Sequence, residues 1–216
     1  MKQIYPDLWQ TRVEHPFSGV NSHAYLLVQD TGNILFYNSG SREEYQHIQE
    51  LGGITYQFLS HRDEVGSALA EIKTLFGSKL CCHRLEEPVA RKVTPVDYLF
   101  DGRETLQGNI EVIPTPGHTK GSVCFLVRSV HGQTYLFTGD TLYMNHGIWE
   151  TRTNWYEGGS KSDLKSSLML LRDLDPTRDL DPMVIISSAS VGAVPFKAIS
   201  AEEWRSDIDN VLRTLS

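Results

Sequence analysis

Three short segments of this chain place metal-binding types of side chain beside tight turns. His118 lies in the segment TPGHTKGS, where a Pro-Gly pair favours a turn that leaves the imidazole at its tip. Asp140 lies in FTGDT, and a Gly-Asp pair after a strand is a common way to present a carboxylate. His61 and Asp63 lie two residues apart in LSHRDE, so both side chains could face one ion. Imidazole and carboxylate groups bind divalent metals, and the segments together therefore predict a metal site.

Each segment alone also has an ordinary structural interpretation. A single histidine in a loop is more often hydrogen-bonded at the surface or in the core than bound to a metal, and an aspartate after glycine is often turn chemistry. The combination of the three segments, in this order and with helical segments between them, is what indicates a functional site.

The chain resembles the metallo-β-lactamase superfamily of hydrolases over most of its length. The segment NSHAYLLV is similar to an early N-x-x-x-Y-L-L-V strand of that family, and TPGHT and FTGDTL are similar to two of its site segments. The resemblance implies an α/β fold, a four-layer αβ/βα sandwich of two mixed β-sheets with helices on the outer faces. It also implies that His118 is the metal-binding histidine after TPG, that Asp140 is the aspartate that bridges two metals, and that His61 is the first histidine of the motif T-H-x-H-x-D-H.

The rest of that motif is depleted in this chain. Without gaps, Asp63 stands where the second histidine belongs, Val65 where the aspartate belongs and Gly66 where the last histidine belongs. A gapped alignment of DEVG with D-H-x-G retains Asp63 as the aspartate and still loses both later histidines. The family's final histidine follows the last core strand, but the chain has no histidine beyond His146, so that ligand is absent as well.

A reduced, mononuclear site is the first hypothesis from these residues. His61, Asp63, His118 and Asp140 would hold one divalent metal, with zinc as the first expectation and iron or manganese as alternatives. The predicted reaction is hydrolysis of a small ester, thioester or lactone by a metal-activated water, whose proton Asp63 or Asp140 could accept. The two carboxylates would offset the charge of the ion, so weak or atypical activity is expected.

A catalytically inactive protein is the alternative hypothesis. Loss of several ligands together favours a metallo-β-lactamase-fold protein that binds or regulates without catalysis. His83, His146 and Glu64 remain candidates to replace the missing ligands, although His83 beside a run of charged residues is more simply structural. Tyr25, Tyr143, Trp149 and Trp155 are candidates to line an apolar cleft. His15, His23, His47 and His131 carry no functional signal.

The elements that must position these residues follow from apolar patterning and turn residues. Strands are expected at 8–13, 24–29, 34–37, 56–60, 79–82, 110–113, 122–127, 134–137 and 183–186. Helices are expected around Tyr45–Leu51, from Glu64 to a Gly77 cap, after a capping-box-like segment from Ser160 to Asp163, and from Ser200 with Glu203. Strand-rich and mixed segments alternate, which predicts two packed sheets with outer helices in one domain spanning residues 1–216.

Composition restricts the partners. Of 216 residues, 40% are hydrophobic, and the net charge of −7 with no long basic run argues against nucleic acid. The chain lacks an apolar run long enough for a membrane span or a signal peptide, so a cytoplasmic protein acting on a small molecule is expected, without a membrane partner. Cys81, Cys82 and Cys124 form no metal-binding spacing and are expected to be buried and unpaired. The sequence leaves the oligomeric state open, with a homodimer as one alternative.

Overall fold

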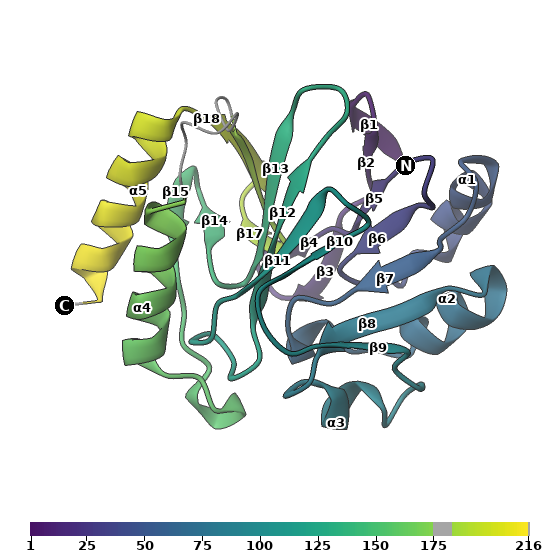
Figure 1. Cartoon of the computed structure of the whole chain (residues 1–216), viewed down its shortest axis with the longest axis horizontal. Helices are drawn as coiled ribbons and strands as arrows, with labels where there is room; N and C mark the ends of the chain where they lie inside the picture. Colours follow the sequence, from purple (N-terminus) through teal and green to yellow (C-terminus); the bar gives the residue numbers. More distant parts are fainter. Residues whose placement is uncertain (175–182, 216) are drawn as a thin grey trace.

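The computed structural model describes residues 1–174 and 183–215. Two mixed β-sheets face each other in the middle of the molecule, and helices cover the outer face of each sheet (Figure 1). This arrangement confirms the expected four-layer αβ/βα sandwich. None of the helices in the described ranges is long and apolar enough to cross a membrane.

The first sheet combines antiparallel hairpins with parallel crossover strands. Its order is β1 (Lys2–Tyr5), β2 (Leu8–Gln10), β5 (Tyr25–Leu27), β6 (Ile34–Phe36), β7 (Tyr56–Phe58), β8 (Lys79–His83) and β9 (Tyr98–Phe100). The strands from β6 to β9 are parallel to one another. Because parallel strands have their carboxyl ends at the same edge of the sheet, the segment that follows β7 lies at that edge, together with the loops that follow its parallel neighbours.

The second sheet supplies two further site loops. Its order is β10 (Glu104–Leu106), β11 (Ile110–Pro114), β12 (Val123–Arg128), β13 (Thr134–Gly139), β16 (Met183–Ser187) and β18 (Phe196–Ile199). The pairing of β13 with β16 is parallel, with Phe137 opposite Ile186 and Gly139 opposite Ser187. The residues that follow β13 and β16 are therefore neighbours, although they are far apart in the sequence.

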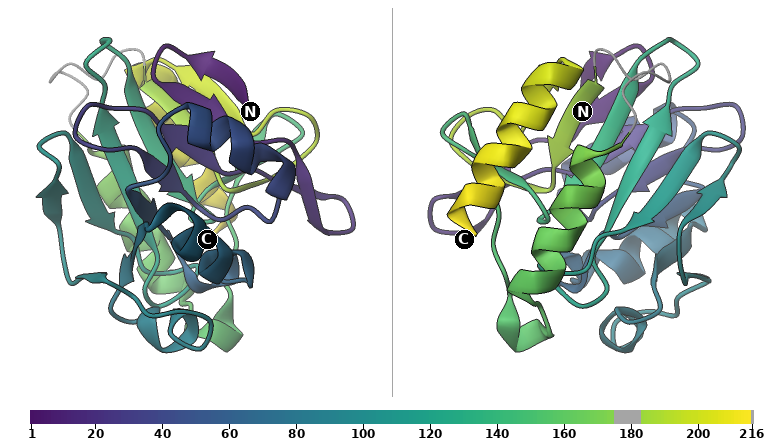
Figure 2. Two further views of the ribbon diagram at one scale, coloured as in Figure 1. Left: turned by 90° about the vertical axis from the view of Figure 1, so that its right-hand side faces the viewer. Right: turned by 60° about the vertical axis from the view of Figure 1, so that its left-hand side comes forward.

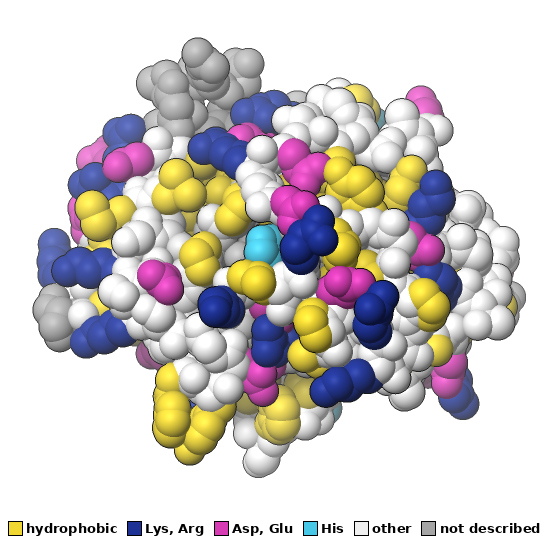
Figure 3. Space-filling view, turned by 60° about the horizontal axis from the view of Figure 1, so that its bottom comes forward, with side chains coloured by type: hydrophobic (Ala, Val, Ile, Leu, Met, Phe, Trp, Pro, Cys, Tyr) yellow, Lys and Arg dark blue, Asp and Glu magenta, His cyan; other side chains and the backbone are white. Residues whose placement is uncertain are grey.

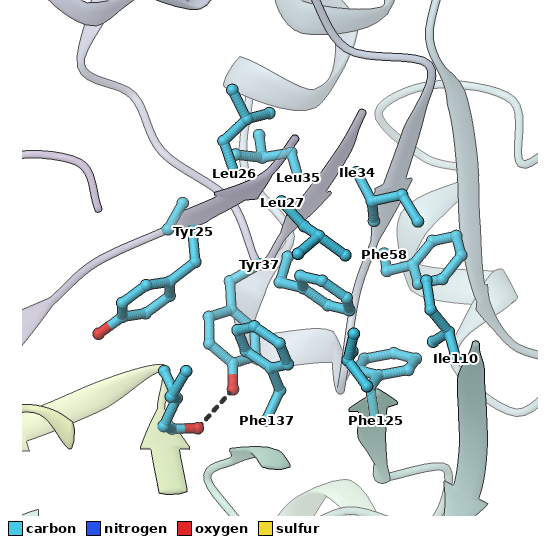
Figure 4. Packing of buried hydrophobic residues seen from close by; sticks show 14 of the residues in the cluster. Tyr25, Leu26, Leu27, Ile34, Leu35, Tyr37, Phe58, Ile110, Phe125 and Phe137 are labelled. Carbon is cyan, nitrogen blue, oxygen red and sulfur yellow. Dashed lines mark hydrogen bonds between the residues drawn. The ribbon is translucent and has the colours of Figure 1, made fainter. Parts of the chain in front are cut away.

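Alternating side chains divide the second sheet between two cores. Phe125 of β12 and Phe137 of β13 face the first sheet (Figure 4). The ring of Phe137 stacks on that of Phe36 with centroids 3.9 Å apart. Cys124 and Leu126 of β12 face the opposite way, toward the outer helices. This period of two is the geometry of a strand buried on both faces. All three cysteines are free and buried, as expected.

The helices form the outer layers. They are α1 (Tyr45–Glu50), α2 (Ala68–Phe76), α3 (Glu87–Ala90), α4 (Lys161–Arg172) and α5 (Ala201–Thr214), with short 3-10 helices η1 (Arg42–Glu44), η2 (Arg62–Glu64) and η3 (Trp155–Glu157). Helices α4 and α5 lie side by side over the second sheet (Figure 2). Ser160 caps α4 by accepting from the N–H of Asp163, without the reciprocal bond of the expected capping box, whereas Ser200 with Glu203 forms a full capping box at the start of α5. Gly77 ends α2 in the left-handed conformation, as predicted.

The boundaries and number of the smaller elements differ from the sequence expectations. Helix α2 begins at Ala68 and not at Glu64, because the 3-10 helix η2 occupies the segment before it. A third, five-stranded sheet was not predicted; its order is β15 (Ile148–Glu150), β14 (Tyr143–Asn145), β17 (Ala189–Val191), β4 (Val20–Ser22) and β3 (Glu14–Phe17). Its strands have three or four residues each, too short for a clear apolar alternation.

Candidate functional site

The four side chains predicted to form the site come together. After β7, His61 lies just before η2 and Asp63 lies within it. His118 lies in the loop after β11, and Asp140 directly follows β13. One donor atom from each of His61, Asp63 and His118 can be chosen so that the three lie within 4.8 Å of one another. The two imidazole rings meet edge to face, with centroids 4.8 Å apart.

Asp140 adjoins this cluster through one of its oxygens. Its Oδ2 lies 3.5 Å from Nε2 of His61 and 3.8 Å from Nε2 of His118. Oδ2 of Asp63 lies 3.3 Å from the same Nε2 of His118. Four potential metal donors therefore converge on one small region, two from imidazoles and two from carboxylates.

Two glycines permit this convergence. Gly139 has φ of +53°, and a Cβ atom there would lie 2.1 Å from Oγ of Ser60, so only glycine lets the end of β13 approach the segment that carries His61. Gly117 has φ of +142°, and a Cβ atom there would overlap the backbone of Leu164 at the start of α4. The turn before His118 is thus pressed against a helix, which fixes the position of the loop.

Hydrogen bonds fix the tautomers of both histidines. Nδ1 of His118 lies 2.8 Å from the carbonyl oxygen of Arg152, which can only accept, so this nitrogen carries the proton. Nδ1 of His61 lies 2.9 Å from Oγ of Ser60, and that hydroxyl donates in turn to Glu64. Each ring therefore donates through Nδ1 and presents Nε2 to the carboxylates, which is the usual arrangement of a metal-binding histidine.

Nε2 of His61 is a buried nitrogen without a hydrogen-bond partner among the described residues. In a neutral ring with Nδ1 protonated, this atom carries a lone pair, and it faces Oδ2 of Asp140, another acceptor. Nε2 of His118 likewise faces Asp63 and Asp140. Facing acceptors repel one another unless a proton or a cation lies between them. The residues present therefore fit a bound metal ion.

The electrostatics favour positive charge at this position. Burial opposes a charge on His61, but Asp140 and Glu64 outweigh burial and hold the pKa of His61 well above its ordinary value. Burial also opposes ionisation of Asp140, but the positive charge of His61, 3.5 Å away, holds the pKa of Asp140 well below the usual range. The interaction with Nε2 of His118, 3.3 Å from its Oδ2, lowers the pKa of Asp63 against a smaller effect of burial. The two aspartates are therefore ionised at neutral pH.

Three residues that sequence reasoning missed support the site. Ser188 donates from Oγ to Oδ1 of Asp140 over 2.6 Å. Tyr37, which has φ of +72°, donates to the carbonyl of Ile186 (Figure 4). Its hydroxyl also accepts from the N–H of Gly139. The carbonyl of Arg152 orients His118. Only Ser188 had a sequence signal, because it lies in the segment after β16 where the resemblance places a final histidine.

Arg62 connects η2 to two neighbouring elements. Its guanidinium pairs with Glu86 and lies 2.9 Å from Oε2 of Glu157 in η3. Glu86 is buried, and its Oε1 accepts from Oγ1 of Thr119 at 3.0 Å and from the N–H of Gly121 at 2.6 Å. The loop that carries His118 is thus held through Glu86 by the segment that carries His61.

A cavity of about 840 Å³ opens over the four side chains. Besides them, the residues that line it come from the β3–β4 hairpin, from η3 and from β17, and they include Phe17, His23, Trp155, Tyr156 and Ser190. Trp155 and Tyr156 are exposed and stack on each other with centroids 3.6 Å apart. On the face drawn in Figure 3, acidic and basic side chains are interspersed with hydrophobic ones around a visible histidine.

Some of the secondary candidates lie in the cavity and others do not. Glu64 lines it, with Oε1 3.2 Å from Nδ1 of His61. His83 and His146 are absent from the described residues that line it; His83 ends β8, where its Nδ1 accepts from the N–H of Leu85.

The expected aromatic lining is partly wrong. Tyr143 and Trp155 line the cavity, whereas Tyr25 and Trp149 are buried in the two cores. His15 and His23 line it although their sequence context gave no signal, because His15 lies in β3 and His23 directly follows β4, the strand that pairs with it.

Known proteins share this fold. A structure described as a metallo-beta-lactamase from Pontibacter korlensis has a TM-score of 0.71 and 18% identity, covering 99% of this chain and 97% of that one. The mono-zinc form of the metallo-beta-lactamase FIM-1 from Pseudomonas aeruginosa has a TM-score of 0.71 and 14% identity over 98% and 93%. TTHA1623 in a di-iron-bound form has a TM-score of 0.64 and 23% identity over 89% and 96%.

Sequence comparison leads to the same family. A protein described as "Probable metallo-hydrolase YqgX" from Bacillus subtilis (strain 168) is 25% identical over 175 residues, which cover 71% of this chain and 79% of that protein. The family model described as "Metallo-beta-lactamase superfamily" matches residues 38–188, a range that includes His61, Asp63, His118, Asp140 and Ser188. Since this match spans well over half of the sequence, the chain belongs to the metallo-β-lactamase superfamily.

Proposed function

We propose that this protein is a metal-dependent hydrolase of a small ester, thioester or lactone that works with one divalent ion. The observation that carries the proposal is the buried Nε2 of His61, which has no hydrogen-bond partner among the described residues and faces Asp140 beside the second imidazole, His118. His61, Asp63, His118 and Asp140 would hold the ion. Zinc suits two imidazoles with carboxylates, and iron or manganese suits the same donors.

A divalent ion at this position supplies Lewis acidity, which lowers the pKa of water and polarises a carbonyl group. The chain's own residues position the reactants and accept the proton. Asp63 is better placed than Asp140 to accept it, because its side chain is 39% exposed whereas that of Asp140 is 24% exposed. Oδ2 of Asp63 is used by His118 and Asn154, and Oδ1 has no hydrogen-bond partner among the described residues.

The lowered pKa of Asp63 makes its carboxylate a weak base, so proton transfer to it is expected to be slow. Two carboxylates near one ion also offset its charge, which weakens Lewis acidity. Modest turnover is therefore part of the proposal.

The cavity favours a substrate with an apolar or aromatic part. Phe17, Trp155 and Tyr156 contribute exposed aromatic surface to its wall, which would hold such a group while the carbonyl reaches the four donors. The net charge of −7 supports a small molecule over nucleic acid as the partner. The three free, buried cysteines support a reducing compartment such as the cytoplasm.

Elemental analysis of the purified protein tests the proposal. Metal content is measured as isolated, after chelation and after addition of Zn²⁺, Mn²⁺ or Fe²⁺, and each form is assayed with a panel of esters, thioesters and lactones. One tightly bound ion per chain, lost together with hydrolysis in His61→Ala and His118→Ala, is the expected result. Two ions per chain would show that the ligand set is incomplete, with Glu64 as the nearest further carboxylate.

A non-catalytic binding or regulatory protein is the second candidate. The residues at the positions of the missing ligands favour it. Gly66 has no side chain that could bind a metal, and the hydroxyl of Ser188 already donates a hydrogen bond to Asp140. Absence of metal uptake under every condition, with small molecules still bound in the cavity, would favour this candidate over the hydrolase.

A further inference from the structure

We propose that Ser188 is a positioning residue for the metal site, which holds Asp140 so that only its Oδ2 is offered to the ion. The inference rests on the proposed function, because it concerns the same ion. Oγ of Ser188 donates to Oδ1 of Asp140 over 2.6 Å, whereas Oδ2 is the oxygen that lies 3.5 and 3.8 Å from Nε2 of His61 and His118. The two oxygens of one carboxylate therefore have different partners.

The backbone of Ser188 is tied to both sides of the site. Its N–H donates to the carbonyl of Gly139 at 3.4 Å, and its own carbonyl accepts from the N–H of His23 at 3.2 Å. The next residue, Ala189, begins β17 and pairs with Ser22 of β4. Ser188 is 6% exposed. A buried hydroxyl on a backbone fixed at both ends has little freedom, so it can hold the carboxylate in one orientation.

The physical consequence concerns metal affinity. A free carboxylate beside an ion rotates and exchanges its oxygens, and this freedom must be lost on binding. A hydroxyl that holds one oxygen removes the freedom in advance. Partners that orient a metal ligand typically contribute a factor of about 10–100 to metal affinity.

Ser190, in the strand β17 that follows Ser188, provides a matched control. It lies two residues further along the chain, lines the same cavity and is 1% exposed. Its Oγ has no hydrogen-bond partner among the residues that the structure describes. Removing this hydroxyl changes the same chemical group in the same wall without touching Asp140.

The experiment measures Zn²⁺ affinity by competition with a chelator, and the absorption spectrum of the Co²⁺-loaded protein. Ser188→Ala is expected to weaken Zn²⁺ binding about 10–100-fold and to shift the Co²⁺ d–d bands. Ser190→Ala is expected to leave both unchanged. Ser188→Thr and Ser188→Val form a second pair, which tests the hydroxyl even if the smaller alanine side chain disturbs folding. Threonine and valine have nearly equal shapes and differ in the hydroxyl, so the Thr variant should retain tight Zn²⁺ binding and the Val variant should lose it.

The outcomes separate this inference from the proposed function. Zn²⁺ bound by the wild-type protein and by Ser188→Ala with the same affinity and the same Co²⁺ spectrum would overturn the role of Ser188 alone. Equal affinity in the Thr and Val variants would do the same. No uptake of Zn²⁺ or Co²⁺ by the wild-type protein would overturn the proposed function, and the role of Ser188 with it.

Discussion

The imidazole of His118 is oriented by the carbonyl oxygen of Arg152, 34 residues further along the chain and 2.8 Å from Nδ1. The same ring presents Nε2 to Asp63 and Asp140. Because a carbonyl oxygen only accepts hydrogen bonds, the tautomer of His118 is set by the fold before any ion arrives. The loop between β15 and η3 therefore takes part in the site through a backbone carbonyl, in addition to the side chain of Asn154, which donates to Oδ2 of Asp63.

Replacement of His118 by alanine should remove tight metal binding. The change deletes one of two imidazole donors, so the loss of Zn²⁺ affinity should exceed the factor of about 100 that is typical for a group that only orients a ligand. The fold should persist, because His118 lies in a loop and not in either large core. Metal content and circular dichroism are the measurements.

His146→Ala is the control, since His146 lies outside the cavity lining and is solvent-exposed. It should bind metal like the wild-type protein. Retention of tightly bound zinc by His118→Ala would show that the ligand assignment is wrong.

Replacement of Arg62 by alanine should destabilise the protein by about 3 kcal/mol, because it leaves the buried carboxylate of Glu86 without its cation. The side chain of Arg62 is 17% exposed and that of Glu86 is 2% exposed. Urea unfolding followed by circular dichroism measures the change. The loop that carries His118 should also loosen, because Glu86 accepts from Thr119 and Gly121.

Arg84→Ala serves as the comparison, because Arg84 and Asp101 form a pair in which both side chains are more than half exposed. Exposed pairs contribute about 0–1 kcal/mol. Equal effects of the two substitutions on the free energy of unfolding would contradict the assignment of a structural role to Arg62.

Removal of the aromatic pair in η3 should impair substrate binding and spare the metal. Trp155 and Tyr156 line the cavity, are mostly exposed and contribute little to the cores. The double change to alanine should raise KM for esters with an aromatic acyl group about tenfold, which corresponds to 1.4 kcal/mol of lost contact. Zn²⁺ affinity should stay at the wild-type value.

Ile148→Ala removes a similarly exposed apolar side chain that is not part of the described cavity wall. It should change neither KM nor metal affinity. An unchanged KM in the η3 variant, measured with both small and aromatic esters, would place the substrate elsewhere in the cavity.

The sequence predicted the parts of the site that are encoded locally. The turn residues around His118 and Asp140 and the strand before His61 could be recognised because strand, turn and ligand are adjacent in the chain. Ser188 could not be assigned, because it reaches Asp140 across 48 residues through the parallel pairing of β13 with β16. His23 was missed for a similar reason: strands of three or four residues do not show which partner they choose.

The metal-free protein should lose stability as the pH rises above about 6.5, the ordinary value for histidine. The pKa of His61 is raised in the folded state by Asp140 and Glu64 against the effect of burial, so the stabilisation by its proton is fully present below the unfolded value and is lost as the pH rises through the folded value. The lowered pKa of Asp140 acts with the opposite sign, since its contribution is present above about 3.9 and is lost as the pH falls.

Bound metal should prevent the loss of stability at alkaline pH, because the ion takes the place of the proton between His61 and Asp140. Metal binding should therefore release that proton. Melting temperatures between pH 5 and pH 9, with and without chelator, measure the profile, and calorimetry in buffers of different ionisation enthalpy counts the protons released on Zn²⁺ binding. The variant His61→Gln should show neither the alkaline loss of stability nor the proton release. A chelated wild-type protein whose melting temperature stays flat from pH 6 to pH 9 would show that His61 carries no extra proton, and that its Nε2 faces Asp140 as a neutral acceptor.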